Sequence, residues 1–301
     1  IGLTTLDISD MKTKLLFLIV VLCNISCKAE LKNTEDSPVV AEKSVAESEP
    51  AVKTIAWNKS WKYADKAVIC SSSVKLYRAS ANRKNKVVAV NAGHGTKGGQ
   101  SKKVLCHPDG SPKCVSGSTK AGATKATAVA GGMSFLNKEG EAAVTLKLAL
   151  KLKELLLAEG YDVLMIRETA DAQLDNIART VFANNNADIH IAIHFDGSKN
   201  DKGSFYVGVP NIASYRDMEP VASHWKEHEA LGKALNEGMK QAGVKVWKSG
   251  SMAIDLTQTS FSTIPSIDYE TGDAASDISE AGLKKMAQGY LYGIKKFFGS
   301  K

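Results

Sequence analysis

The segment KVVAVNAGHG, residues 86–95, decides the fold because a strand in it runs directly into a turn that carries a histidine. Residues 87–90 form an uninterrupted apolar run, which indicates a short buried strand. The glycines on either side of His94 indicate a turn where that strand ends. The sequence therefore predicts a strand that presents His94 at its carboxyl end.

A second predicted strand also ends in a histidine. In IHIAIH, residues 189–194, isoleucines alternate strictly with His190, Ala192 and His194, so the two sets face opposite sides of the strand. Four strand residues span about 13 Å, which is too far for His190 and His194 to bind one metal ion. We therefore expect His190 in the core or just behind the metal ligands.

Other strands are expected at residues 161–166, 205–209 and 264–270, and helices at residues 141–159, 174–184, 223–242 and 281–298.

The alternation of strands and helices predicts an α/β domain. We expect a three-layer sandwich, in which helices cover both faces of a twisted sheet that is mixed but largely parallel. Functional groups of such sheets gather beyond the carboxyl ends of the strands. His94, His194 and Glu270 each end a predicted strand. Glu141 begins a predicted helix, and we expect it to join the other three at one edge of the sheet.

These four residues are of the types that hydrolyse an amide with zinc. A catalytic zinc site often has two imidazoles, one carboxylate and an open position, for which His94, His194 and Glu141 are candidates. A further carboxylate, for which Glu270 is available, must take a proton from water and pass it to the leaving nitrogen. Glu141 follows His94 by 47 residues (141 − 94) and precedes His194 by 53 (194 − 141). Only tertiary folding can bring such distant residues together.

Residues 86–298 resemble the zinc amidases of the amidase-3 type, which act on N-acetylmuramoyl-L-alanine bonds. The order of several motifs carries the resemblance. They are the strand into Gly93-His94-Gly95, the helix start at Glu141, Arg167 and Asp171 after a strand, Arg179 on a helix, the strand ending in His194, and PSIDYE at residues 265–270.

The resemblance implies both the activity and the site. One zinc ion per chain would be bound by His94, Glu141 and His194, and Glu270 would be the catalytic carboxylate. The enzyme would cleave the amide bond between N-acetylmuramic acid and the L-alanine of the stem peptide, with peptidoglycan as its partner.

The sequence departs from the family pattern in four places. They are Thr96 in place of a second glycine, Phe195-Asp196 after the second histidine, Thr271-Gly272-Asp273 after the catalytic glutamate, and a long Gly/Ser/Thr/Lys-rich stretch at residues 96–136. A loop of that length in a compact domain is functional or an insertion. The departures after His194 and Glu270 leave a non-catalytic wall-binding or activator protein on an amidase scaffold as the alternative. A zinc endopeptidase acting on stem peptides is a third possibility.

Several residues compete with the assigned ones. Glu139 competes with Glu141, and Asp268 and Asp273 compete with Glu270. The segment HWKEH, residues 224–228, matches the inverted zinc-protease motif H-x-x-E-H. Its helix is polar and rich in Lys and Glu, which favours a solvent-facing helix over a metal site.

Three cysteines lie outside the amino-terminal leader. Cys106 and Cys114 could close a small disulfide loop, which would leave Cys70 over, or all could be free thiols. With His107, the pair makes only an incomplete structural metal site.

The net charge is +7, without a basic block dense enough for a nucleic-acid groove. We expect a solvated basic surface, with attraction to an anionic wall polymer as the alternative.

The amino-terminal residues predict export. Residues 1–10 are expected to be upstream or added residues. Residues 11–27 combine two early lysines with an apolar run far shorter than the ~20 residues that span a bilayer, which predicts a secretory signal peptide. The segment NISC, residues 24–27, resembles a lipobox with Asn24 in place of leucine, so Cys27 is a candidate lipid anchor.

Three segments follow this leader. Residues 28–54 lack aromatic residues and predict a disordered linker. Residues 55–85 are expected to form a small N-terminal cap packed on the catalytic domain, residues 86–301. The protein is expected in the cell wall, outside the cell or lipid-anchored at the outer face of the cytoplasmic membrane. Any membrane contact would be through Cys27.

Overall fold

The structure is a computed structural model and describes residues 50–299. The chain divides into two units, Ile1–Glu47 and Ser48–Lys301, and the described residues belong to the second. The expected signal peptide, the candidate lipid anchor at Cys27 and nearly all of the expected linker lie outside the described residues. No described helix combines the length and apolar character needed to cross a membrane.

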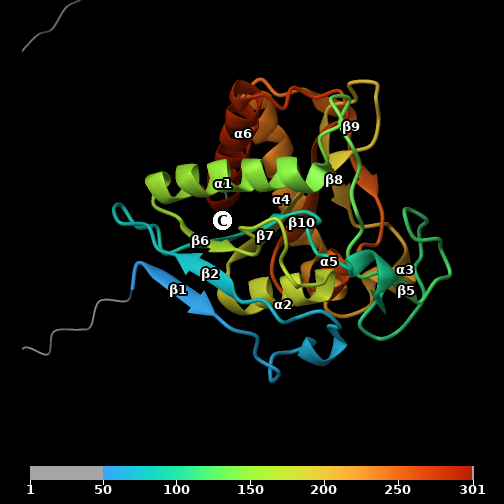
Figure 1. Cartoon of the computed structure of the whole chain (residues 1–301). Helices are drawn as coiled ribbons and strands as arrows, with labels where there is room; N and C mark the ends of the chain where they lie inside the picture. The colour runs from blue at the N-terminus through green and yellow to red at the C-terminus, as the bar shows by residue number, and fades with distance from the viewer. Residues whose placement is uncertain (1–49, 300–301) are drawn as a thin grey trace, which may run out of the picture. The chain divides into compact units, whose positions relative to one another are not determined.

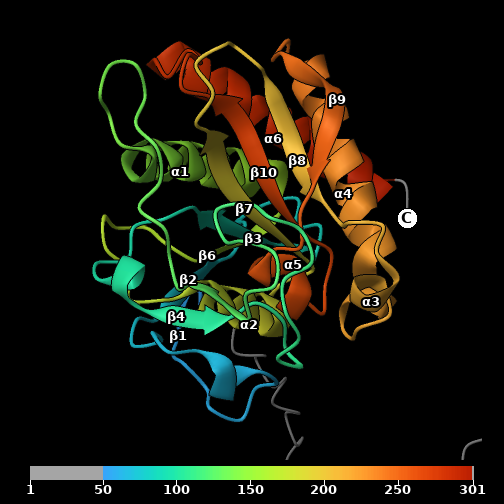
Figure 2. The same ribbon diagram turned by 90° about the vertical axis from the view of Figure 1, so that its right-hand side faces the viewer.

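An eight-stranded mixed sheet forms the centre of the described unit. Its strands, in spatial order, are β1 (Val52–Ile55), β2 (Val74–Tyr77), β6 (Asp162–Met165), β3 (Val87–Ala92), β7 (Ile189–Asp196), β10 (Ser266–Asp273), β8 (Ser204–Gly208) and β9 (Val246–Ala253). The four central strands β6, β3, β7 and β10 are parallel. The strands that flank them, β2 and β8, are antiparallel to their neighbours β6 and β10. Figure 2 shows β10 between β7 and β8.

Helices cover both faces of this sheet. One layer holds α1 (Glu141–Glu159), α4 (Val221–Gln241) and α6 (Glu280–Gly299), and the other holds α2 (Asn176–Asn186) and α5 (Thr257–Phe261). Figure 1 shows α1 and α6 above the sheet and α2 and α5 below it. A short helix, α3 (Ala213–Arg216), precedes α4. The three-layer α/β sandwich expected from the sequence is therefore confirmed.

Helix α1 shows why the layers hold together. Val144, Leu148, Leu152 and Leu156 recur every four residues and are completely buried in the larger core. Burying one such side chain contributes roughly 1.5–3 kcal/mol. Gly160 ends the helix in the left-handed conformation with φ of 98°, which glycine adopts at little cost. This fixed helix places Glu141, its first residue, against the ends of the strands.

The amino-terminal part of the described unit belongs to the same sheet. Strand β2 lies within the segment expected to be a small cap packed on the catalytic domain, and it pairs with β6 in the main sheet. Strand β1 includes residues 52–54, where the sequence predicted linker. The reason is that β1 is an edge strand with three exposed residues out of four, so it lacks the apolar alternation by which a strand is recognised.

Two buried histidines lie where β7 and β10 begin. His190 Nδ1 is 3.1 Å from Ser266 Oγ, and His228 Nδ1 accepts the Ser266 N–H at 3.0 Å. Burial lowers the pKa of each imidazole to about 3. Both rings are therefore neutral at physiological pH, and His190 belongs to the core.

Candidate active site

Three side chains from distant parts of the sequence meet at the carboxyl edge of the central strands. His94 Nε2 lies 2.9 Å from Glu141 Oε1, and His194 Nδ1 lies 3.1 Å from both of these atoms. Within residues 50–299, these three form the one group of three or more His, Cys, Asp or Glu side chains close enough to share a metal ion. The expected convergence of the three side chains is thus observed.

The donor atoms fit a zinc ion. Ligand bonds of about 2.0–2.1 Å in a tetrahedral site require ligand atoms about 3.3 Å apart. The three separations of 2.9 to 3.1 Å need to widen by only a few tenths of an ångström to admit it. Two imidazoles and one carboxylate leave a fourth position for substrate or water, which is the composition of many catalytic zinc sites.

Two buried arginines hold the turn that carries His94. Arg167 Nη2 donates to the Gly93 carbonyl at 2.9 Å, and Arg179 Nη2 donates to the His94 carbonyl at 2.6 Å. Burial lowers the pKa of Arg167 to about 10 and of Arg179 to about 9, so both stay charged at neutral pH. His94 has a φ of 63°, a conformation uncommon outside glycine. The two arginines and the hydroxyl of Thr96, a partner of Arg179, stabilise it.

The end of the insertion orients two of the three candidate ligands. His94 Nδ1 donates to the Ala130 carbonyl at 2.8 Å, so Nε2 is the nitrogen that faces the shared site. Glu141 Oε2 accepts the Met133 N–H, and Glu141 Oε1 accepts the Phe195 N–H, both at 2.9 Å. Residues 130–133 therefore belong to the site.

The ionisation of Glu141 is set by the two imidazoles. Burial alone would raise the pKa of Glu141, but the hydrogen bonds from His194 and His94 outweigh it and hold that pKa well below its ordinary value. Burial would lower the pKa of His194, but the charges of Asp268 and Glu141 raise it to about 10. The negative charges of Asp268 and Glu141 thus favour a positively charged group between these two carboxylates.

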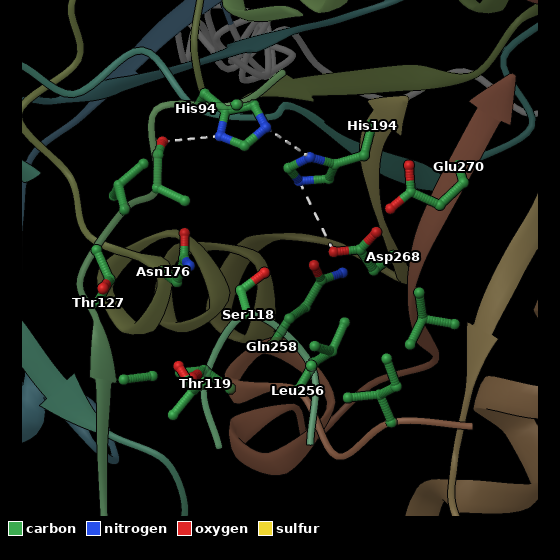
Figure 3. A pocket seen from close by; sticks show the side chains of 18 of the residues that line it. His94, Ser118, Thr119, Thr127, Asn176, His194, Leu256, Gln258, Asp268 and Glu270 are labelled. Carbon is green, nitrogen blue, oxygen red and sulfur yellow. Dashed lines mark hydrogen bonds and ion pairs between the residues drawn. The ribbon is translucent and has the colours of Figure 1, made fainter. Parts of the chain in front are cut away.

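Glu270 lies beside this group on the neighbouring strand. It is paired in register with His194 across β10 and β7, and its carboxylate lies on the β10 side of the His194 ring (Figure 3). Its Oε2 atom is buried and has no hydrogen-bond partner among residues 50–299. Burial, followed by the charge of Asp268, raises the pKa of Glu270 well above its ordinary value. A buried carboxylate oxygen with no protein partner is available to a water molecule or a substrate.

A cleft of about 600 Å³ opens in front of these residues. Opposite the histidines it is lined by Ser118, Thr119 and Thr127 of the insertion and by Asn176 and Gln258 (Figure 3). These are neutral groups that can donate and accept hydrogen bonds. The insertion at residues 96–136, which includes β4 (Lys103–Leu105) and β5 (Lys125–Thr127), therefore forms one wall of the cleft.

Asp255 anchors that wall. Its carboxylate accepts the N–H groups of Cys114 and Val115 at 2.6 and 2.9 Å and contacts His107 Nε2 at 2.9 Å and Lys113 Nζ at 3.4 Å. Burial would raise the pKa of Asp255, but the hydrogen bond from His107 and those from the backbone lower it to about 2. Sequence reasoning missed Asp255, because it follows β9 outside any recognisable motif.

We predict that Asp255→Ala loosens the insertion. The change leaves two N–H groups and His107 without their buried acceptor and removes the ion pair with Lys113, which keeps its bond to the backbone carbonyl of residue 255. Breaking such a network costs about 3–5 kcal/mol. Urea unfolding should show this loss, and hydrogen exchange at residues 114 and 115 should become faster. Asp109→Ala is the matched control, since Asp109 is exposed and accepts the Ser111 N–H within its own turn. Unchanged exchange in the Asp255 variant would contradict the anchoring role.

The competing residues lie outside the group. Glu139 pairs with Lys147 on the surface side of α1. Asp273 accepts the N–H groups of Lys202 and Ala275 and so holds a turn. Asp268 lies near His194, with its Oδ2 atom 3.7 Å from His194 Nε2. Its position could have been inferred, because residues 268 and 270 of one strand point to the same side.

The other histidine and cysteine motifs form no metal site. His224 Nδ1 is bound to the Pro220 carbonyl, and His228 Nδ1 to the Ser266 N–H. The prediction of a solvent-facing helix is wrong for His228, which is completely buried because α4 packs on α6 and the sheet. The described cysteines, Cys70, Cys106 and Cys114, are free thiols.

The departures after the second histidine and the glutamate have packing roles. The Phe195 ring packs against Phe135 with centroids 5.0 Å apart, while Asp196 pairs with Lys202 at 2.9 Å. The Thr271 hydroxyl lies 2.6 Å from the Tyr290 hydroxyl in the core. None of these side chains enters the group formed by His94, Glu141 and His194.

Residues 88–296 match the Amidase_3 family model, which is described as N-acetylmuramoyl-L-alanine amidase. The chain therefore belongs to the amidase-3 family of peptidoglycan hydrolases. No curated protein matches the chain.

Solved structures share this fold. The N-acetylmuramyl-L-alanine amidase Ami1 from Mycobacterium smegmatis is similar with a TM-score of 0.60 and 17% identity, over 73% of this chain and 100% of that one. The apo form of Ami1 from Mycobacterium abscessus gives 0.55 and 18%, over 71% and 99% of the two chains. AmiC2 of Nostoc punctiforme gives 0.51 and 17%, over 72% and 99%.

Proposed function

We propose that this amidase is zinc-dependent and holds one zinc ion with His94, Glu141 and His194. The observation that carries the proposal is the meeting of their three ligand atoms within 4.8 Å of one another, beside the buried carboxylate of Glu270. The scissile bond is the amide between N-acetylmuramic acid and the L-alanine of the stem peptide.

The residues divide the work of amide hydrolysis. When bound, zinc supplies a Lewis acid that polarises a carbonyl and lowers the pKa of water. Glu270 takes the proton from the attacking water and delivers it to the alanine nitrogen, which leaves as the new amino terminus. The Oε2 atom of Glu270 is available for this proton, because no group in the described part of the chain forms a hydrogen bond with it. The neutral side chains of the cleft wall orient the substrate through hydrogen bonds.

Metal removal tests the proposal. The purified protein is incubated with defined muropeptides, and the products are identified by mass spectrometry with and without a zinc chelator. We expect glycan and free stem peptide with an L-alanine amino terminus, loss of turnover with the chelator, and recovery with added zinc. Metal analysis should give one zinc per chain.

Other products would point to the other activities considered. A cut between two amino acids of the stem would indicate an endopeptidase, and new reducing ends would indicate a glycosidase. Binding of cell wall without turnover or zinc would indicate a non-catalytic wall-binding protein. The substrate lies outside the cytoplasmic membrane, and we propose that residues 11–27 direct export, with Cys27 as the candidate anchor.

A further inference from the structure

The two histidines of the site use different ring nitrogens. His94 points Nε2 toward the shared site and donates from Nδ1 to the Ala130 carbonyl. His194 is turned the other way, with Nδ1 toward His94 and Glu141. Its Nε2 atom faces the carboxylate of Asp268, with 3.7 Å between Nε2 and Oδ2 (Figure 3).

A metal-binding imidazole needs a partner for its second nitrogen. A hydrogen bond from that nitrogen to a carboxylate or a carbonyl fixes the tautomer and the orientation of the ring, and it makes the ligating nitrogen more basic. His94 has such a partner in Ala130. For His194, the carboxylate of Asp268 lies in the corresponding place.

The fold leaves Asp268 free for this task. On strand β10, residues 268 and 270 point to the same side, and residue 268 lies in register with Ala192, two residues before His194 on β7. The Asp268 Oδ1 atom is buried and has no protein partner within the described residues. The Asp268 side chain is 17% exposed, and the contact of its Oδ2 atom with His194 is its ion pair within the described residues.

We propose that Asp268 is a positioning residue, which accepts the Nε2–H of His194 and thereby presents Nδ1 to the metal ion. The proposal rests on the proposed zinc site. Asp268 is not itself a ligand, because it faces the nitrogen turned away from the shared site and lies outside the group that could hold an ion. If Asp268 bound the zinc ion directly, it would also occupy the fourth coordination position, which the substrate or water needs.

The nitrogen used by His194 gives the most direct test. Long-range ¹H–¹⁵N spectra of the zinc-loaded protein distinguish a metal-bound nitrogen from one that carries a proton, and a His194→Gln variant assigns the signals. We expect Nδ1 of His194 to be metal-bound and Nε2 to be protonated, with the opposite pattern for His94. Zinc bound through Nε2 of His194 would overturn the inference. If no zinc bound at all, the proposed function itself would fail.

Zinc affinity gives a second test that does not depend on turnover. By competition with a chelator, Asp268→Ala should bind zinc about 10- to 100-fold more weakly than the wild type. Asp268→Asn should lie between the two, because its amide oxygen still accepts the N–H but carries no charge. Asp196→Asn removes the same charge from the same cleft, where Asp196 pairs with Lys202, and it should stay within about twofold of the wild type.

Circular dichroism and urea unfolding establish that each variant is folded before its affinity is compared. An affinity of Asp268→Ala equal to that of Asp196→Asn would overturn the positioning role. A loss confined to Asp268→Ala, with partial recovery in Asp268→Asn, is the result expected.

Discussion

Glu270→Gln is expected to lower turnover by about 10²- to 10⁴-fold, the range for loss of general acid–base catalysis, while one zinc ion remains bound. Glutamine has nearly the shape of glutamate but cannot take a proton from water. Because Glu270 lies outside the group of candidate ligands, metal content should be unchanged. The measurement is the rate of release of stem peptides with amino-terminal L-alanine, alongside zinc analysis of the same sample.

Glu139→Gln is the control for that substitution. Glu139 lies two residues before Glu141, but its carboxylate pairs with Lys147 instead of joining the group. The turnover of the Glu139→Gln variant should match that of the wild type within about twofold. Turnover by Glu270→Gln at the wild-type rate would show that another group, with Asp268 the nearest alternative, moves the proton.

Gly93→Ala is expected to abolish zinc binding without unfolding the protein. A Cβ atom at residue 93 would lie 2.3 Å from His194 Cε1 and 2.6 Å from each of its ring nitrogens. The imidazole must therefore move, and a ligand displaced by about 1 Å no longer completes a metal site. Overpacking of this kind costs about 1–3 kcal/mol of stability, which is less than the roughly 5–15 kcal/mol by which native proteins are stable, so the variant should stay folded.

A second glycine near the site supplies the control for this prediction. A Cβ atom at Gly140, just before α1, would meet nothing within 4 Å, so Gly140→Ala should keep its zinc. Isothermal titration with zinc measures both variants. Wild-type affinity in Gly93→Ala would mean that His194 does not need the position that it has in the structure.

Local sequence patterns predicted the long helices and the central strands. Helix α1 begins and ends at the predicted residues, because its apolar residues recur every four positions and Gly160 stops it. Strand β3 was found as a short apolar run, and β7 was found by the strict alternation of its isoleucines. Strand β9 was missed, since its residues are partly buried or exposed in pairs and not alternately. Strand β1 was missed because it is an exposed edge strand, and β2 was missed because its alternation of buried and exposed residues extends over only four residues.

The candidate ligands were predicted by a different kind of signal. His94, His194 and Glu270 end predicted strands, and parallel strands bring their carboxyl ends to one edge. The resemblance to a family then assigned each a role. No comparable signal marked Asp255 or the carbonyl of Ala130, because a buried anchor and a backbone oxygen have no sequence pattern of their own.

By itself, the sequence determined the long helices, the central strands and the residue types that stand at their ends. These depend on the spacing of apolar residues and on glycines, which are properties of neighbours in the chain. The tertiary structure decided which nitrogen of each histidine faces the shared site, that Asp268 stands behind His194, and that the insertion forms a wall of the cleft. Those facts depend on strand register and on packing between segments that lie far apart in the chain. The separations between the ligand atoms of His94, Glu141 and His194 were therefore set only when the sheet formed.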